Sequence, residues 1–270
     1  MIEIFKIEKI MLTALLKAAG IKEVKNNVRW QKYINTKHIT LGIETAKQRK
    51  LAKQGYPELN QLAFDEQLEV LTALIKQSDI LEVKNQCIMF LDQHKKKKLN
   101  HKHWLVIKEW VKYIDNWAHS DGLSSIYTIM LQNHLELIYA QLQQWNKSKN
   151  LWERRQSLVC LFYYSRTRKQ FLSFEQCIVL ITNLLDDKEY YVQKGLGWAL
   201  REASNVYYEY TFDFIQQHIK LIKPVAYSAA IEKLLPQHKE IMKVMRKKKI
   251  HLLGVDFFWM IKIFMLQVEH

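Results

Sequence analysis

Three short segments carry side chains that could take part in catalysis. In the first, Ile114-Asp-Asn-Trp-Ala-His-Ser-Asp-Gly122, Trp117 precedes Asp121 by four residues, so both lie on one face if the segment is helical. The second segment is Leu151-Trp-Glu-Arg-Arg155 and the third is Tyr191-Val-Gln-Lys-Gly-Leu-Gly-Trp-Ala-Leu-Arg-Glu202. If the three segments lie side by side, they bring indoles, one carboxylate and several cations into one groove.

These side chains suit a reaction that develops positive charge. A fixed carboxylate such as Asp121 can stabilise that charge or position a water molecule. The indole face of Trp117 or Trp198 attracts the same cation, by about 0.5–2 kcal/mol per contact. We therefore take Asp121, Trp117 and Trp198 as candidate catalytic residues. The candidate DNA-binding residues are Arg155, Arg154, Lys194, Arg201 and Trp152.

Each of these residues also has a structural alternative. Trp117 and Trp198 could pack in the core, where tryptophan is usually largely buried. Asp121 could be a helix N-cap, a position that aspartate favours. His119 could be a surface or capping residue. The basic side chains could form ion pairs, either with Glu153 or Glu202 or between repeats. This alternative covers Arg154, Arg155, Lys194 and Arg201.

The elements that position these residues are expected to be helices. Only 7 glycines and 3 prolines occur in 270 residues, too few for the many turns of a β-rich fold. Apolar residues recur at helical spacing, as in the stripe from Leu68 to Ile75. The expected helices span residues 66–76, 83–91, 103–116, 121–145, 152–164, 173–185, 191–204, 211–221 and 225–235.

The helices form pairs of regular length. The second helices of successive pairs begin near Asn116, Trp152, Val192 and Val225, roughly 33 to 40 residues apart. That period is typical of HEAT-like arrays, in which neighbouring pairs stack to bury their apolar faces. We predict an all-α HEAT-like solenoid (an α-α superhelix) with a concave, basic face. Residues 1–25 form an N-terminal helix, 26–240 the repeat domain, and 241–270 a basic and apolar extension.

Charge and composition point to a nucleic-acid partner. The formal net charge is +14, with 41 Lys and Arg against 27 Asp and Glu, and such an excess attracts polyanions. The alternative is that a basic surface only favours solubility. The runs Lys95–Lys98 and Arg246–Lys249 could hold phosphate or be solvated faces.

Other features favour a cytoplasmic protein. Cys87, Cys160 and Cys177 are widely spaced and predict packed thiols rather than a disulfide framework. Charges interrupt the apolar tail from Ile250 to His270, so it predicts a packed or partner-covered segment rather than a membrane span. We expect no metal, no other cofactor, no membrane association and a monomer.

The three segments together resemble the AlkD family of DNA alkylation repair glycosylases, which are built from HEAT-like repeats. The family pattern has a Trp four residues before an Asp, then Trp-x-Arg-Arg, then Val/Ile-Gln-Lys-x-x-Gly-Trp-x-Leu-Arg-Glu. This chain carries Trp117 with Asp121, Trp152-Glu-Arg-Arg155, and Val192-Gln-Lys-Gly-Leu-Gly-Trp-Ala-Leu-Arg-Glu202. The resemblance covers roughly residues 27–235, with a small insertion suspected near residues 164–171.

The resemblance implies hydrolysis of the N-glycosidic bond of N3- or N7-alkylated purines in double-stranded DNA. It makes Asp121 the catalytic carboxylate, places Trp117 and Trp198 beside the lesion, and gives Arg155 a contact to the backbone. The chain departs from the pattern at Tyr227-Ser-Ala-Ala230, where Arg-Glu-Ala is expected, and around Trp117. Two alternatives stay open: a catalytically silent repeat protein that binds distorted or branched DNA, and a protein-binding scaffold.

Overall fold

The computed structural model describes residues 4–247, and nearly all of its ordered elements are α-helices. Within that range the model contains no β-strand, and its only β-type pairing is an isolated bridge between Ile39 and Ile80. The first eight helices are α1 (Ile4–Ala19), α2 (Val28–Ile34), α3 (Thr45–Gln54), α4 (Pro57–Asn60), α5 (Phe64–Gln77), α6 (Leu81–Lys98), α7 (His101–Ile107) and the 3-10 helix η1 (Lys108–Tyr113). The others are α8 (Trp117–Asn133), α9 (Leu135–Asn146), α10 (Leu151–Phe162), α11 (Phe174–Asn183), α12 (Tyr190–Ala203), α13 (Tyr208–Gln217), α14 (Pro224–Ala230) and α15 (Pro236–Lys247).

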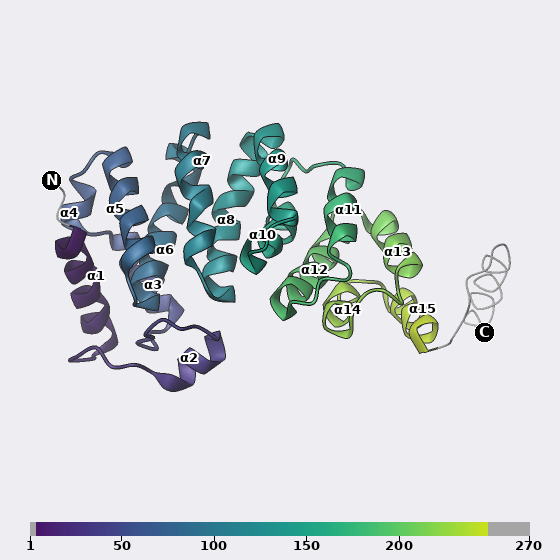
Figure 1. Ribbon diagram of the computed structural model, residues 1–270, viewed down its shortest axis with the longest axis horizontal. Helices are drawn as coiled ribbons and strands as arrows, with labels where there is room; N and C mark the ends of the chain where they lie inside the picture. Colours follow the sequence, from purple (N-terminus) through teal and green to yellow (C-terminus); the bar gives the residue numbers. More distant parts are fainter. Residues whose placement is uncertain (1–3, 248–270) are drawn as a thin grey trace.

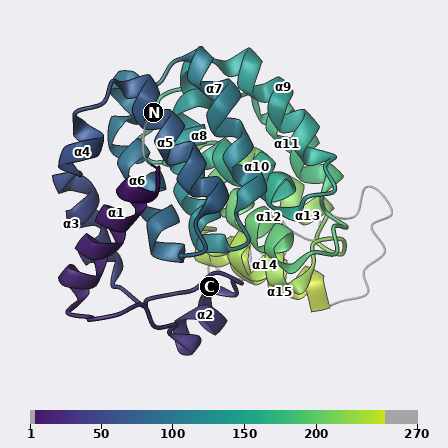
Figure 2. The same ribbon diagram turned by 60° about the vertical axis from the view of Figure 1, so that its left-hand side comes forward.

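From α5 onward, successive helix pairs stack along the length of the molecule in chain order (Figure 1). The second helices of the pairs, α6, α8, α10, α12 and α14, pack against one another in succession. Figure 2 shows α7, α9 and α11 in a layer outside α8, α10 and α12. These second helices begin where the spacing predicted, so the all-α helical-repeat fold is confirmed.

Large aromatic side chains fill the space between the two layers. Trp104 of α7 contacts Tyr127 of α8 edge-on, with ring centroids 5.3 Å apart, and Trp145 of α9 contacts both rings. All three residues are at most 3% exposed. Aromatic pairs of this kind contribute about 0.5–1.5 kcal/mol beyond the burial of their area. They join α7, α8 and α9 into one packed unit.

Close approach of two helices explains a glycine in the third motif segment. A Cβ built on Gly197 of α12 would lie 2.3 Å from the carbonyl oxygen of Ala226 in α14. Real side chains do not pack at that distance, so the two helices can touch only because position 197 has no Cβ. Gly197 therefore sets the spacing between these two repeats.

The three cysteines are packed thiols, as predicted. Cys87, Cys160 and Cys177 are all buried and free. Burial raises the pKa of Cys160 and of Cys177 to about 12, which keeps both thiols protonated and unreactive at neutral pH.

Several helix boundaries differ from the predictions. The helix expected to end at Leu91 continues as α6 to Lys98, since lysine is a good helix former. The segment 103–116 is divided between α7 and η1, and the segment 121–145 between α8 and α9, where His134 leaves the helical conformation. Pro236 begins α15 instead of only ending the preceding helix, which stops at Ala230.

The ends of the chain were predicted separately. Among residues 4–247, no helix combines the length and apolarity that a membrane crossing requires. The predicted apolar tail, residues 250–270, lies outside the described residues, and of the extension predicted from residue 241 the structure describes only the part up to Lys247.

Candidate functional site

The first motif segment forms the start of α8. Asn116 is the N-cap, and its side-chain oxygen accepts a hydrogen bond of 2.9 Å from the backbone N–H of His119. Asp121 lies one turn into the helix, directly after Trp117 on the same face. The N-cap alternative for Asp121 was therefore wrong, because Asn116 already provides the cap.

His119 fixes the start of α8 against α6 and is buried, so its expected place at the surface was wrong. Its Nε2 lies 3.1 Å from the carbonyl oxygen of Leu81, and its Nδ1 lies 2.8 Å from the side-chain nitrogen of Asn116. An amide nitrogen only donates, so Nδ1 accepts and the proton is on Nε2. Burial lowers the pKa of His119 to about 3, so the ring is neutral at physiological pH.

Asp121 and Arg155 form an ion pair between successive repeats. Nη2 of Arg155 donates a hydrogen bond of 2.8 Å to Oδ1 of Asp121. The arginine side chain is 8% exposed and the carboxylate 40%. Among the described residues no hydrogen bond reaches Oδ2 of Asp121, which leaves that oxygen for solvent or a substrate. The buried arginine therefore fixes one oxygen of a half-exposed carboxylate.

Arg155 is itself fixed by α12. Its Nη1 donates 2.8 Å to the carbonyl oxygen of Tyr191, and a Cβ on Gly195 would lie 3.2 Å from its Cγ. Gly195 thus leaves room for the arginine to lie flat between α10 and α12. Its Nε is buried without a hydrogen-bond partner. Because its guanidinium is already bound to Asp121 and to the carbonyl oxygen of Tyr191, Arg155 supports the carboxylate instead of occupying the open position expected for a backbone contact.

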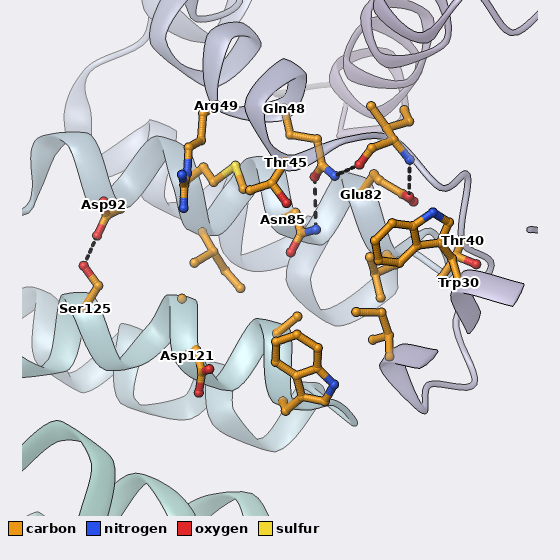
Figure 3. Close-up of a pocket in the computed structure, with 18 of the residues that line it drawn as sticks. Trp30, Thr40, Thr45, Gln48, Arg49, Glu82, Asn85, Asp92, Asp121 and Ser125 are labelled. Carbon is orange, nitrogen blue, oxygen red and sulfur yellow. Dashed lines mark hydrogen bonds between the residues drawn. The ribbon is translucent and has the colours of Figure 1, made fainter. Parts of the chain in front are cut away.

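Trp117 stands at one end of an aromatic series on the wall of a cavity. Its ring contacts Tyr33 edge-on at 5.8 Å, and Tyr33 contacts Trp30 in the same way at 5.4 Å. The cavity has a volume of about 920 Å³ and is bounded by α2, α3, α6, α8 and the residues after α10. Figure 3 shows Asp121 and Ser125 of α8 on one side, across from Arg49, Asn85 and Trp30. Trp117 and Asp121 therefore share one hollow.

Trp198 is connected to this cavity through another aromatic ring. It packs on Tyr163 at 5.7 Å with an angle of 31° between the rings, and Tyr163 lines the cavity. Trp198 does not itself line the cavity. Burial raises the pKa of Tyr163, and the nearby Tyr164 and Asp121 raise it further. Trp117 thus lies in the wall of the cavity, whereas Trp198 lies outside the cavity and packs against Tyr163.

The remaining predicted DNA contacts have varied surroundings. Trp152 is 7% exposed and packs on Tyr191, so it acts as a core residue rather than the expected DNA contact. Arg154 donates 2.6 Å to Asp187 and also bonds two backbone carbonyls. Buried and paired side chains cannot reach a ligand without breaking these contacts.

The two cations of α12 differ from each other. Arg201 binds Glu202 and Glu232, each at 3.1 Å, which is the ion pairing weighed as its structural alternative. Its guanidinium also lies 5.7 Å from the ring centre of Trp198. Lys194 is exposed one turn before Trp198. Lys194 is thus the more accessible of the two.

Several residues that line the cavity carry no signal in the motif segments. They include Trp30, Tyr33, Arg49, Asp92 and Tyr163. The Tyr163-Tyr164 pair at the end of a predicted helix was a visible signal, but nothing local connects α2 to α8. In the part of the chain that is described, no group of three His, Cys, Asp or Glu side chains could hold a metal ion.

Comparison with known proteins agrees with the helical-repeat fold. The family profile described as DNA alkylation repair enzyme matches residues 12–234. A structure described as a predicted DNA alkylation repair enzyme from Enterococcus faecalis has a TM-score of 0.65 and 16% identity, covering 79% of this chain and 99% of that chain. AlkD2 from Streptococcus mutans has a TM-score of 0.50 and 19% identity, covering 76% and 96%. No curated protein matches the chain. Since the family profile spans most of the sequence, the chain belongs to the DNA alkylation repair enzyme family.

Proposed function

We propose that the protein is a DNA glycosylase that hydrolyses the N-glycosidic bond of N3- or N7-alkylated purines in double-stranded DNA. One observation carries the proposal: the half-exposed carboxylate of Asp121, held by the buried Arg155, shares a cavity wall with the indole of Trp117. Membership of a family of DNA alkylation repair enzymes supports the same reaction.

The chemistry requires little more than a fixed negative charge. Alkylation at N3 or N7 makes the purine cationic, which weakens the glycosidic bond. As the base leaves, positive charge builds on the sugar in an oxocarbenium-like state. Oδ2 of Asp121, which has no hydrogen bond within the described chain, would face that charge or orient the attacking water. The base leaves as a neutral purine, and water supplies the hydroxyl that ends on the sugar and releases its other proton to the solvent.

The indoles support the cationic lesion. The edge contact with Tyr33 fixes the orientation of the Trp117 ring, so the ring presents the same surface to a bound base. A cation over an indole face gains about 0.5–2 kcal/mol. Trp198, which packs on Tyr163, would contact the DNA on the side of Asp121 that is opposite to Trp117. Monomeric binding to one duplex accounts for both contacts and is part of the proposal.

The test is release of alkylated bases by the purified protein. DNA that contains N7-methylguanine and N3-methyladenine is incubated with the parent and with Asp121→Asn, and free base is measured by chromatography. We expect Asp121→Asn to lower release by at least about 100-fold while DNA affinity changes little. Asp213→Asn, at an exposed aspartate of α13, is the matched control and should release base normally.

The other outcomes have clear meanings. Equal release by the parent and Asp121→Asn would contradict the assignment of the carboxylate. No release by the parent, with salt-sensitive DNA binding retained, would contradict the glycosylase proposal and favour a silent DNA-binding repeat protein.

A further inference from the structure

A second hollow lies further along α8, beyond the candidate active site. It has a volume of about 520 Å³ and lies between the last turn of α8 and the loop that joins α10 to α11. Gln132 and Asn133 form one side, and Thr167, Arg168 and Lys169 form the other. No acidic residue lines it, so its charged side chains are both cations.

Arg168 is the unusual residue of this hollow. It is 8% exposed, yet no carboxylate of the described chain forms an ion pair with it. Its Nε donates 2.7 Å to the carbonyl oxygen of Gln170, and its Nη1 makes a long contact of 3.4 Å to that of Cys160. Its Nη2 is buried without a hydrogen-bond partner.

Three other arginines of low exposure in the described chain are paired with carboxylates. Arg154 pairs with Asp187, Arg155 with Asp121, and Arg201 with Glu202 and Glu232. A buried cation without an anion is unfavourable, because desolvation is not offset by attraction. Burial lowers the pKa of Arg168 only to about 10, so the guanidinium stays charged at neutral pH. The charge of Arg168 therefore has no neutralising carboxylate within the described chain.

The loop that carries Arg168 is held in position before any ligand binds. The carbonyl oxygen of Tyr164 accepts hydrogen bonds from the backbone N–H groups of Thr167 and Arg168, at 2.9 and 3.0 Å. The hydroxyl of Ser165 donates a hydrogen bond of 2.5 Å to the carboxylate of Glu202 in α12. The Arg168 guanidinium lies 4.2 Å from the ring centre of Phe171. Tyr164 has φ 58°, a left-handed conformation that a non-glycine residue adopts only when its surroundings require it. A prearranged loop lowers the entropic cost of binding.

The hollow adjoins the candidate active site. Tyr164 lines both hollows, and its hydroxyl lies 2.8 Å from that of Ser125. Positions 121, 125, 129 and 133 lie along α8 at intervals of four residues, and each step turns about 40° around the helix axis, so Asn133 lies about 120° around the axis from Asp121. The distance along the helix from Asp121 to Asn133 is about 18 Å, equal to about five base pairs of duplex axis. This separation is within the length of a duplex that also passes Asp121.

We infer that the hollow between Arg168, Lys169 and the last turn of α8 binds a backbone phosphate of the DNA strand that flanks the lesion. This inference rests on DNA being the substrate of the proposed function. Arginine and lysine side chains donate charge-assisted hydrogen bonds to phosphate oxygens, and the side-chain amides of Gln132 and Asn133 add neutral donors. Such a contact positions the duplex and reads no sequence.

The experiment measures binding to an undamaged duplex as a function of salt concentration. Arg168→Gln removes the buried cation, and Gln132→Glu adds a negative charge at the opposite wall without touching the loop. Each should weaken binding about three- to tenfold at 0.15 M salt and lower the salt slope by about one. The matched controls are Lys102→Gln, an exposed lysine of α7, and Gln217→Glu, an exposed glutamine at the end of α13. Both should bind nearly as the parent does.

Two results would overturn the inference. One is parent-like binding and salt slope in both variants. The other is weaker binding by Arg168→Gln alone, together with a lower unfolding temperature, which would make Arg168 a structural support of its loop. Because the duplex carries no lesion and no base release is measured, the outcome is independent of whether the protein is a glycosylase.

Discussion

Asp121 of α8 and Arg155 of α10 share a hydrogen bond of 2.8 Å across the boundary between two repeats, and only the carboxylate reaches the cavity. The arginine is anchored a second time, to the carbonyl oxygen of Tyr191 in α12. Three consecutive repeats therefore determine where one carboxylate oxygen points. This arrangement makes Arg155 a positioning residue in the proposed reaction.

Replacement of this arginine should reduce base release more than DNA binding. In Arg155→Lys the shorter, non-planar head group cannot bond Asp121 and Tyr191 together, so the carboxylate loses its fixed orientation. We expect the single-turnover rate of base release to fall about 100-fold, with DNA affinity lowered only slightly. Arg154→Lys, one residue earlier and paired with Asp187, is the control. Equal rates for the two variants would show that the Asp121 pair has no role in positioning.

The tryptophans of the first two segments should behave differently. Trp117→Leu removes the indole from the cavity wall and should lower the rate of base release about 10-fold or more. Trp152→Leu removes a buried ring that packs on Tyr191, so it should lower the free energy of unfolding by about 2–4 kcal/mol. Rates measured well below each unfolding transition, together with urea titrations, separate the two effects. A large rate defect in folded Trp152→Leu would contradict this division.

Gly197 should be far less tolerant of a methyl group than Gly122. In Gly197→Ala the new Cβ meets the backbone of Ala226 at 2.3 Å, and the backbone of α14 cannot move aside without loss of packing. We expect a loss of about 1–3 kcal/mol in the free energy of unfolding, the usual effect of overpacking. In Gly122→Ala the nearest atom, at 2.8 Å, is Cγ2 of the Ile88 side chain, and a side chain can shift more easily than a helix backbone, so the loss should be smaller. Urea unfolding of both variants measures the difference.

Acid should destabilise the fold partly through His119. Its pKa is about 3 in the folded chain and near 6.5 when unfolded, so between these values the unfolded chain binds more protons. Stability from His119 is therefore complete above pH 6.5 and is lost as the pH falls towards 3. Burial also lowers the pKa of His38, which acts in the same direction.

Urea midpoints at pH 7 and pH 5 test this dependence. His119→Gln removes the titrating ring, so its midpoint should change less between the two pH values than that of the parent. His101→Gln, at an exposed histidine, should keep the parent's dependence. An equal pH dependence in the parent and His119→Gln would contradict the assignment.

Helical periodicity and helix spacing were sufficient to predict the repeat fold. The scarcity of glycine and proline excluded a β-rich chain, and the starts of the second helices near residues 116, 152, 192 and 225 agree with α8, α10, α12 and α14. Helix ends were less predictable, because local patterns do not show that the segment 103–116 divides between α7 and η1 or that α8 stops at Asn133. Those boundaries depend on packing between repeats.

The sequence by itself determined that Trp117 and Asp121 share a helix face, because that relation depends only on a spacing of four residues. Only the tertiary structure decided which partners surround them. It buried Arg155 behind Asp121, enclosed Trp152, and brought Trp30 and Tyr33 of α2 to a cavity formed by α8. It also left Arg168 buried without a carboxylate. These contacts join residues tens of positions apart, and their geometry follows from how the repeats stack, which no local pattern encodes.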